Sequence, residues 1–436
     1  MKHFAEARSE IRQFLLAAPT RQGIARACAV WDLEGRIRLF VEADDAKAAP
    51  ELRKRLEAGL ASAAEGFWSG ALWISSEARS IAEKHVFEEA WTGGRELEPA
   101  VPEIRELERH LSKESWFGLS AAPPWPLEGT APPILSFFSF KGGVGRTTAA
   151  ASFAIQLARA KRRVTIIDLD LEAPGLGVLF STAAARSLHG VVDYLLERTK
   201  YKGTSLVLED YTFQCADPAI IGLDGVPITV MPAGELDALY IEKLARIDYA
   251  RLVAGAEGEP PLASLLRQFK RESDYILIDS RAGIHDIGGL ALNGLAHFDV
   301  LVSLDTEQGW EGLRLVVRHL GRERLERGAK QQDCGVVFGM APGALTSERP
   351  PAATAFRNRA YDLFTTEYYE PAGDPEANWP VPDVASDDKP HHPAVVGFNT
   401  DLLRPRSLAA AADVLTQGDY KDLTEWLLRR LGRTEP

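Results

Sequence analysis

The second part of the chain alternates short apolar runs with longer stretches whose apolar residues recur at helical spacing. The apolar runs, which predict strands, cover residues 134–140, 163–169, 228–232, 275–279, 300–304 and 335–340. Continuous apolar strands that alternate with helices are typical of a parallel sheet covered on both faces. We therefore predict a doubly wound, mostly parallel α/β domain over residues 134–436.

Residues 1–118 show a different pattern, in which helical spacing and short strand-like runs are mixed. The predicted elements are helices over 4–17 and 47–64, a hairpin of strands 24–32 and 36–42, a strand over 70–75, and helices over 76–84 and 101–112. Glu34-Gly35 provides the turn of the hairpin. This mixture predicts a smaller N-terminal α+β domain, and no catalytic constellation is visible in its sequence.

A proline-rich segment separates the two patterns. Residues 120–133 read SAAPPWPLEGTAPP, which is typical of a linker, and we place the linker at residues 119–133. A chain of 436 residues is long enough for two or three domains of ordinary size. The expected order is therefore an N-terminal domain, a linker and a larger α/β domain.

Composition and charge narrow the class of protein. The chain is 45% hydrophobic and 26% charged, as in ordinary globular proteins. Its net charge of −12 argues against nonspecific DNA binding by the whole surface, although a local basic patch stays possible. The three cysteines are far apart and show no metal-binding spacing, which favours a reducing compartment. The chain shows neither a signal peptide nor an apolar run of membrane-spanning length, so we expect a cytoplasmic protein without membrane attachment.

The most specific motif is a glycine-rich run, FKGGVGRTT, over residues 140–148. It lies between a predicted strand and a predicted helix, where successive backbone N–H groups and the positive end of the helix bind phosphate. The hydroxyl of Thr147 stands where such loops hold Mg²⁺. We predict a nucleotide site formed by Gly142, Gly143, Val144, Gly145, Arg146, Thr147 and Thr148.

The run departs from the standard phosphate loop at Phe140 and Arg146 and has a lysine, Lys141, at its start. It resembles the deviant loop Lys-Gly-Gly-Val-Gly-Lys-Thr-Thr of the ParA/MinD family of dimerising ATPases, of the SIMIBI class, at every position except Arg146. The resemblance implies that Lys141 reaches across a dimer interface to the partner's nucleotide. Arg146 is a planar, permanently charged group that is able to contact phosphate, so we count it with Lys141 among the catalytic residues.

The strand over 163–169 ends in an Asp-x-Asp pair, Asp168 and Asp170. Ligands bind at the carboxyl ends of parallel strands, which is where this pair falls. The ParA/MinD resemblance implies that Asp168 lies near Mg²⁺ and that Asp170 positions or deprotonates the attacking water. The alternative is a pair of solvated aspartates at the end of a strand.

The strand over 275–279 ends in Asp279 and is typical of a Walker B segment. Its carboxylate is expected to hold Mg²⁺ beside Thr147. Two interpretations of Arg281 stand side by side: a charge sensor or arginine finger at the phosphates, or an ion pair with Asp286 or another acid.

Two further segments bear on the nucleotide base and on partners. The chain has no Asn/Thr-Lys-x-Asp sequence after its late strands, which favours ATP over GTP, and by resemblance residues 340–343, with Pro342, wrap the adenine. Residues 423–431 form an amphipathic arginine-rich helix that either binds membrane or, as we favour, covers the sheet. Trp310 is either an interface anchor or a packing residue.

The resemblance implies an ATP- and Mg²⁺-dependent homodimeric switch that hydrolyses ATP to regulate the positioning or assembly of a partner. The partner would bind through the N-terminal domain or the switch loops, and nucleic acid is a less favoured partner. The alternative is a nucleotide-binding scaffold or sensor with slow or no hydrolysis, in a bacterial regulatory or defence assembly.

Overall fold

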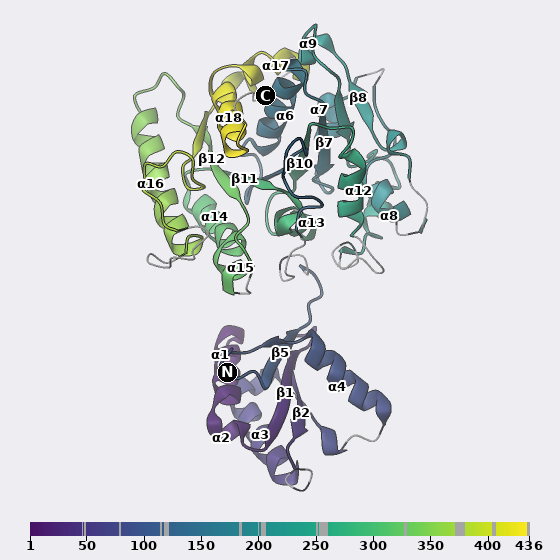
Figure 1. Cartoon of the computed structure of the whole chain (residues 1–436), viewed down its shortest axis with the longest axis vertical. Helices are drawn as coiled ribbons and strands as arrows, with labels where there is room; N and C mark the ends of the chain where they lie inside the picture. Colours follow the sequence, from purple (N-terminus) through teal and green to yellow (C-terminus); the bar gives the residue numbers. More distant parts are fainter. Residues whose placement is uncertain are drawn as a thin grey trace. The chain divides into compact units, whose positions relative to one another are not determined.

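The computed structural model divides into two compact units, Met1–Leu111 and Ser112–Pro436, drawn in Figure 1. It describes all residues except 46, 48, 78–79, 114–115, 117–121, 183–184, 199, 202–205, 250–251, 253–259, 327–328, 371–379, 403–406 and 434–436. The first residues of the predicted linker therefore lie outside the described part of the chain, as does much of the segment that follows Glu370.

The first unit is built on a five-stranded mixed sheet with the order β3-β2-β1-β5-β4. Its strands are β1 (Ile24–Trp31), β2 (Ile37–Ala43), β3 (Trp68–Ile74), β4 (Arg95–Glu96) and β5 (Ile104–Glu108). Its helices are α1 (Phe4–Leu16), α2 (Ala18–Arg21), α3 (Ala49–Ala64) and α4 (Ile81–Gly93). Strands β1 and β2 pair antiparallel, which confirms the predicted hairpin.

The two faces of this sheet are covered by different helices. Ile11 of α1 and Leu56 of α3 are buried with Leu39 of β2 in one apolar cluster. Cys28 of β1 and Ala90 of α4 are buried in a smaller cluster. Burial of apolar side chains on both faces explains why this short sheet forms a unit of its own.

One predicted helix is wrong. Residues 101–112 are predicted from the sequence to be helical, but the structure has strand β5 there, which pairs parallel with β1. The alternation of buried Ile104 and Glu106 with the less buried residues between them fits a strand, so pairing with β1 outweighs helix propensity. The helix expected over 76–84 begins only at Ile81, where the Ser80 hydroxyl accepts a hydrogen bond from the Glu83 N–H at 3.2 Å.

The second unit is built on an eight-stranded sheet with the order β13-β12-β11-β6-β10-β7-β9-β8. Its strands are β6 (Ile134–Phe138), β7 (Val164–Leu169), β8 (Phe213–Cys215), β9 (Ile228–Met231), β10 (Tyr275–Ser280), β11 (Phe298–Ser303), β12 (Cys334–Ala341) and β13 (Ala394–Gly397). All neighbouring strands are parallel except β8 and β9, which are antiparallel. The predicted α/β fold with a mostly parallel sheet is confirmed.

Helices cover both faces of this sheet (Figure 1). They are α6 (Arg146–Arg159), α7 (Leu176–Phe180), α8 (Val191–Arg198), α9 (Pro218–Ile221), α10 (Tyr240–Leu244), α12 (Pro261–Phe269), α13 (Asp286–Leu290), α14 (Glu307–Leu320), α15 (Arg322–Glu326), α16 (Arg349–Glu367), α17 (Leu408–Ala411) and α18 (Gly418–Arg430). In β6, Leu135 and Phe137 are buried in the cluster under α6 and α18, whereas Ile134 and Phe138 are buried in the clusters of the other face. Burial on both faces explains the continuous apolar runs seen in the sequence.

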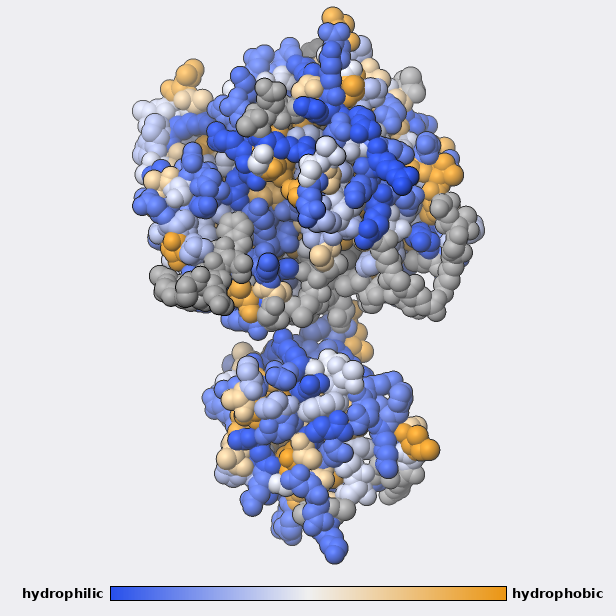
Figure 2. All heavy atoms as spheres, viewed as in Figure 1, coloured by the Kyte–Doolittle hydropathy of each residue, from blue (hydrophilic) through white to orange (hydrophobic). Residues whose placement is uncertain are grey.

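Helix α18 settles the interpretation of the amphipathic segment near residue 430. Leu423, Trp426 and Leu427 are buried, and the helix packs on α6 and β13. This segment therefore covers the sheet, as favoured from the sequence. Within the part of the chain that the structure describes, every helix is too short or too polar to cross a bilayer. Figure 2 shows mainly hydrophilic side chains on the face it presents, with apolar side chains in small scattered spots.

Candidate functional site: a phosphate loop and its carboxylates

The predicted site residues meet at one edge of the large sheet. In the strand register Asp279 of β10 lies opposite Asp168 of β7, and opposite Phe137 of β6 on its other side. The glycine-rich loop follows β6 directly. The carboxyl ends of three neighbouring parallel strands therefore bring the loop and the carboxylates together, as expected for ligand sites in open α/β sheets.

The loop between β6 and α6 has the geometry of an anion cradle. Gly143 and Gly145 have φ of 75° and 92°, a region that side-chain-bearing residues rarely adopt. A Cβ at Gly142, Gly143 or Gly145 would meet no atom within 4 Å, so the space around the loop is open. Gly145 is the N-cap of α6 and leaves the first backbone N–H groups of that helix available to phosphate.

Arg146 turns away from this open space toward the carboxylates. Its Nε donates to Asp279 Oδ1 at 2.7 Å and its Nη2 donates to Asp170 Oδ2 at 3.0 Å, and the residue is 8% exposed. Burial acts to lower the pKa of Arg146, but the two carboxylates outweigh it and raise this pKa above its ordinary value. A guanidinium therefore lies between the two acids that the sequence assigned to metal and water.

The Thr147 hydroxyl and the Asp279 carboxylate form the part of the site that suits a magnesium ion. Thr147 Oγ1 donates to Asp279 Oδ2 at 2.7 Å, so two hard oxygen ligands from different elements lie side by side. In the described ranges no three His, Cys, Asp or Glu side chains are grouped as a metal cage. A pair of oxygens fits Mg²⁺ nevertheless, because this ion takes its remaining ligands from water and phosphate.

The Asp168 carboxylate accepts hydrogen bonds from the backbone of the following loop. Its Oδ1 accepts the N–H of Asp170, and its Oδ2 accepts the N–H groups of Gly175 and Leu176, all at 3.0 Å. The side chain is fully buried. Burial, followed by the charge of Asp279, raises the pKa of Asp168 to about 7. Asp168 therefore shapes the segment that carries Asp170, a role that the sequence did not reveal.

Arg281 pairs with Glu172, an acid in the segment after β7. Its Nη1 lies 2.7 Å from Glu172 Oε2 and 4.0 Å from Asp170 Oδ1. His285 Nδ1 lies 3.1 Å from the other Glu172 oxygen, and burial lowers the pKa of this imidazole. Of the two interpretations of Arg281, the ion pair with another acid describes the structure. No local signal in the sequence connects Glu172 with residues after β10.

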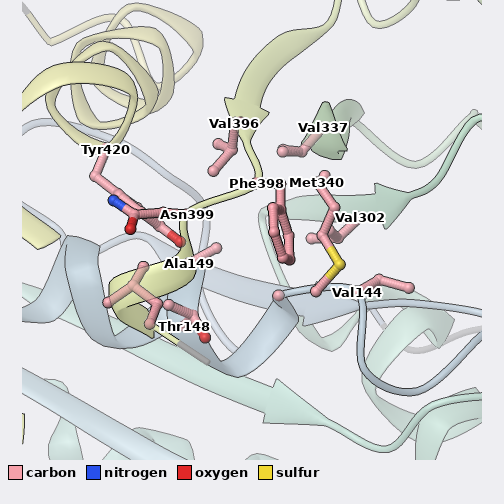
Figure 3. A pocket seen from close by; sticks show the side chains of 14 residues that line it. Val144, Thr148, Ala149, Val302, Val337, Met340, Val396, Phe398, Asn399 and Tyr420 are labelled. Atoms are coloured by element: carbon pink, nitrogen blue, oxygen red, sulfur yellow. The ribbon is translucent and has the colours of Figure 1, made fainter. Parts of the chain in front are cut away.

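A pocket of about 70 Å³ opens beside the loop (Figure 3). Its described lining is Val144, Gly145, Thr148, Ala149, Val302, Val337, Gly339, Met340, Val396, Gly397, Phe398, Asn399, Leu402 and Tyr420. Phe398 and Met340 lie next to each other in its lining in Figure 3, and Phe398 is 45% exposed. Pro342 is not among these lining residues. An apolar slot beside a phosphate loop is suited to a planar base.

Helix α18 helps to shape the segment that carries Phe398. Asp419 accepts two hydrogen bonds of 2.8 Å from the Arg349 guanidinium and one of 2.7 Å from the Gly397 N–H. Tyr420 lines the pocket itself. The pocket thus depends on residues that the sequence analysis did not assign to the site.

The remaining predicted residues take up clear positions. Lys141 is exposed at the start of the loop. Trp310 is buried against Phe356, with ring centroids 4.6 Å apart, and donates from its indole to Asp305 at 2.7 Å. Of its two interpretations, packing describes the structure. Thr306 is the N-cap of α14, because its Oγ1 accepts the Gly309 N–H at 3.1 Å.

Comparison with known proteins identifies the domain. Residues 135–325 match the family model described as the CobQ/CobB/MinD/ParA nucleotide binding domain. A ParA family protein of Mycoplasma pneumoniae is 30% identical over 151 residues, which cover 34% of this chain and 49% of that protein. The septum site-determining protein MinD of Bacillus subtilis is 24% identical over 205 residues, 44% of this chain and 66% of that protein. The chain thus spans less than two thirds of the length of these curated relatives.

Solved structures give a consistent but weaker likeness. A ParA family ATPase from Chlorobium tepidum aligns with a TM-score of 0.46 at 15% identity, over 69% of this chain and 99% of that one. The cell division ATPase MinD of Pyrococcus furiosus aligns with a TM-score of 0.44 at 19% identity, over 68% and 98%. The match of residues 135–325 to the family model, together with the loop, carboxylates and sheet order described above, leads to one conclusion: this chain carries a ParA/MinD-like P-loop nucleotide-binding domain.

Proposed function

We propose that the protein is an ATP- and Mg²⁺-dependent switch whose two states differ in self-association. The observation that carries the proposal is the meeting of a phosphate loop, the Thr147–Asp279 pair and Asp170 at one sheet edge. The names of curated relatives support ATP as the nucleotide, since they include an ATP-binding protein of Methanocaldococcus jannaschii and the chromosome-partitioning ATPase Soj of Treponema pallidum.

Each residue has a distinct task in this proposal. The N–H groups of residues 142–148 bind the phosphates, and Arg146 leaves Asp279 and Asp170 to contact them. Thr147 and Asp279 hold Mg²⁺, which neutralises charge on the phosphate oxygens. Asp170, freed from Arg146, orients the water in line with the γ-phosphate and accepts its proton.

Recognition of the base is assigned to the pocket beside the loop. The Phe398 ring and the Met340 side chain offer an apolar surface to a planar base, and the Asn399 amide offers both a donor and an acceptor. The slot lies within reach of the loop because Val144 and Gly145 line both. Adenine is the base that we propose, since the chain has no guanine-reading Asn/Thr-Lys-x-Asp sequence.

Lys141 is the residue that links nucleotide to self-association. It is exposed at the mouth of the loop, while Arg146 already supplies the local cation. A second cation there is able to reach the phosphates bound by another copy, where it would stabilise charge on the transferring group. The proposed ATP-bound state is therefore a homodimer.

The test is light scattering after size exclusion, without nucleotide, with ADP, and with ATP plus Mg²⁺. We expect a dimer only with ATP plus Mg²⁺, and we expect Lys141→Ala to remain monomeric in all three conditions. Lys421→Ala is the matched control, because Lys421 is an exposed lysine of the same unit whose ion pair is with Glu425 on its own helix. An oligomeric state that is the same in all three nucleotide conditions would overturn the proposal.

A second candidate, a long-lived nucleotide clamp, is favoured by one observation. Arg146 ties Asp279 to Asp170 through two hydrogen bonds, and an arginine that returns to Asp170 after binding would withhold the proton acceptor. A single-turnover measurement with γ-labelled ATP separates the candidates. Turnover faster in Arg146→Lys than in the natural chain supports the clamp, whereas slower turnover supports the switch.

A further inference from the structure

Two residues that precede the large sheet make hydrogen bonds to the loop after β10. The Lys113 backbone N–H donates to Asp286 Oδ1, and its Nζ lies 2.9 Å from Asp286 Oδ2. The Trp116 indole donates to the His285 carbonyl at 2.7 Å. Three contacts from a short stretch therefore fix the two consecutive residues at which α13 begins. We call Lys113 and Trp116 the strap.

Trp116 is anchored in the core of the second unit. It is 6% exposed and packs against Phe138 and His319, with ring centroids 6.3 and 5.2 Å away. Phe138 is the last residue of β6, the strand that leads into the phosphate loop. The indole thus contacts both the loop after β10 and the strand before the phosphate loop.

Lys113 is held in an unusual backbone conformation. Its φ of 67° lies in the left-handed region, which residues other than glycine, asparagine and aspartate seldom adopt. Such conformations persist where surrounding contacts determine them, and they cluster at functional and switch regions. Here the contacts are the two bonds to Asp286 and the Trp116 N–H, which donates to the Lys113 carbonyl at 2.8 Å.

A continuous series of ion pairs runs from this loop to the phosphate site. His285 lies beside Glu172, and Glu172 pairs with Arg281. Arg281 also approaches Asp170, which accepts a hydrogen bond from Arg146. Each partner in the series comes from the segment after β7, the loop after β10 or the phosphate loop. A change in the position of the loop after β10 therefore alters the charge around Arg146 and Asp170.

We propose that the strap holds the loop after β10 in the arrangement in which Arg146 stays paired with Asp170 and Asp279, and so restrains nucleotide binding, an inference that rests on the proposed function. The first unit ends at Leu111, two residues before Lys113. A partner bound by that unit would therefore act close in sequence to the strap. Binding free energies are reciprocal: if the strap weakens nucleotide binding, nucleotide weakens the strap's contacts by the same factor. The strap thus joins the two units functionally.

The test uses the full chain with Lys113→Ala and Trp116→Phe combined. Phenylalanine keeps the ring against Phe138 and His319 but removes the hydrogen bond to His285. The matched control is Lys421→Ala with Trp125→Phe, because the Trp125 indole likewise donates to one carbonyl, that of Pro132, at 2.9 Å. Equal thermal melts of the two double variants establish that both are folded.

Affinity for a non-hydrolysable ATP analogue with Mg²⁺ is measured by titration calorimetry. We expect the strap variant to bind about fivefold more tightly than the natural chain, and the control to stay within about twofold of it. Hydrogen exchange of residues 281–286 should rise in the strap variant before nucleotide is added.

The outcomes separate this inference from the proposed function. If the natural chain binds the analogue and the strap variant binds it equally or more weakly, the restraint is overturned while nucleotide binding stands. If neither binds, the proposed function fails and the restraint fails with it. Unchanged exchange over residues 281–286 would also overturn the strap, because the contacts would then not hold that loop.

Discussion

The two sheets of this protein differ in strand direction and in where their charged side chains lie. In the eight-stranded sheet every pair except β8–β9 is parallel, so the strands direct their carboxyl ends to one edge, where Asp170, Asp279 and Arg146 meet. In the five-stranded sheet, β1–β5 and β2–β3 are parallel but β1–β2 and β4–β5 are antiparallel. Its strand ends therefore have no common edge at which ligands would collect.

Charged groups in the first unit are paired within the unit itself. Buried Glu106 accepts the Trp31 indole N–H at 2.8 Å and has Arg8 and Arg95 within 3.7 Å. The Arg26 guanidinium lies 5.1 Å from the Trp91 ring. Comparison of the two units indicates that charge beside open space marks the candidate site of the second unit, whereas charge enclosed by partners stabilises the fold of the first.

The largest effect is expected at Asp170. Asp170→Asn keeps an oxygen for Arg146 but removes the proton acceptor, so kcat should fall by roughly 10²- to 10⁴-fold while the Kd for ATP changes little. Steady-state hydrolysis and calorimetric binding measure the two quantities. A kcat within about tenfold of the natural value would move the water-positioning role to another residue.

The corresponding change in the first unit should affect stability without affecting catalysis. Glu106→Ala leaves the Trp31 N–H and nearby arginines without their buried partner, at a cost of about 3 kcal/mol. We expect a lower melting temperature for this unit and an unchanged kcat. Glu34→Ala, which removes an exposed member of an ion pair with Arg36, is the control and should change stability by less than about 0.5 kcal/mol. Loss of activity in Glu106→Ala would contradict the division of roles.

A smaller effect is expected at the pocket beside the loop. Phe398→Ala removes the aromatic face proposed to stack on adenine, and ATP affinity should fall about tenfold. Binding of inorganic triphosphate, which has no base, should be unaffected and is the internal control. Equal losses for both ligands would show that Phe398 supports the loop rather than the base.

The smallest effect concerns metal removal from the nucleotide-free protein. Arg146 already pairs with both Asp279 and Asp170 there, so a chelator should shift the melting temperature by less than about 1 °C. With ATP present the same chelator should abolish most of the stabilisation given by nucleotide. Destabilisation of the nucleotide-free protein would mean that a metal, and not Arg146, balances these carboxylates.

Local patterns explain which features could be predicted from the sequence. The glycine-rich loop, Asp168–Asp170 and Asp279 each lie at or just after the carboxyl end of an apolar strand, so their elements and their common edge follow from the order of the runs. Predictions failed or were missing where long-range contacts decide. Strand β5 forms because β1 pairs with it, and β13, only four residues long, gives no periodic signal.

Side-chain partners were harder to predict than backbone elements. Arg281 had two acceptable interpretations, and only the fold brings Glu172 to it. No sequence motif predicts the strap, because Lys113 and Trp116 are defined by their contacts with Asp286 and His285, which are distant in sequence. Phe398 likewise reaches the pocket through the anchoring of its segment by Asp419.

The part that α18 plays at the pocket has a consequence for how the protein is made. Among the described elements that shape the pocket, α18 is synthesised last, yet it supplies Tyr420 and the Asp419 carboxylate that binds Arg349 and Gly397. A chain still on the ribosome can form the phosphate loop early but cannot close the pocket until residues 418–430 have emerged. Nascent copies should therefore be unable to bind nucleotide firmly. The proposed nucleotide-dependent self-association should then begin only after residues 418–430 have been synthesised.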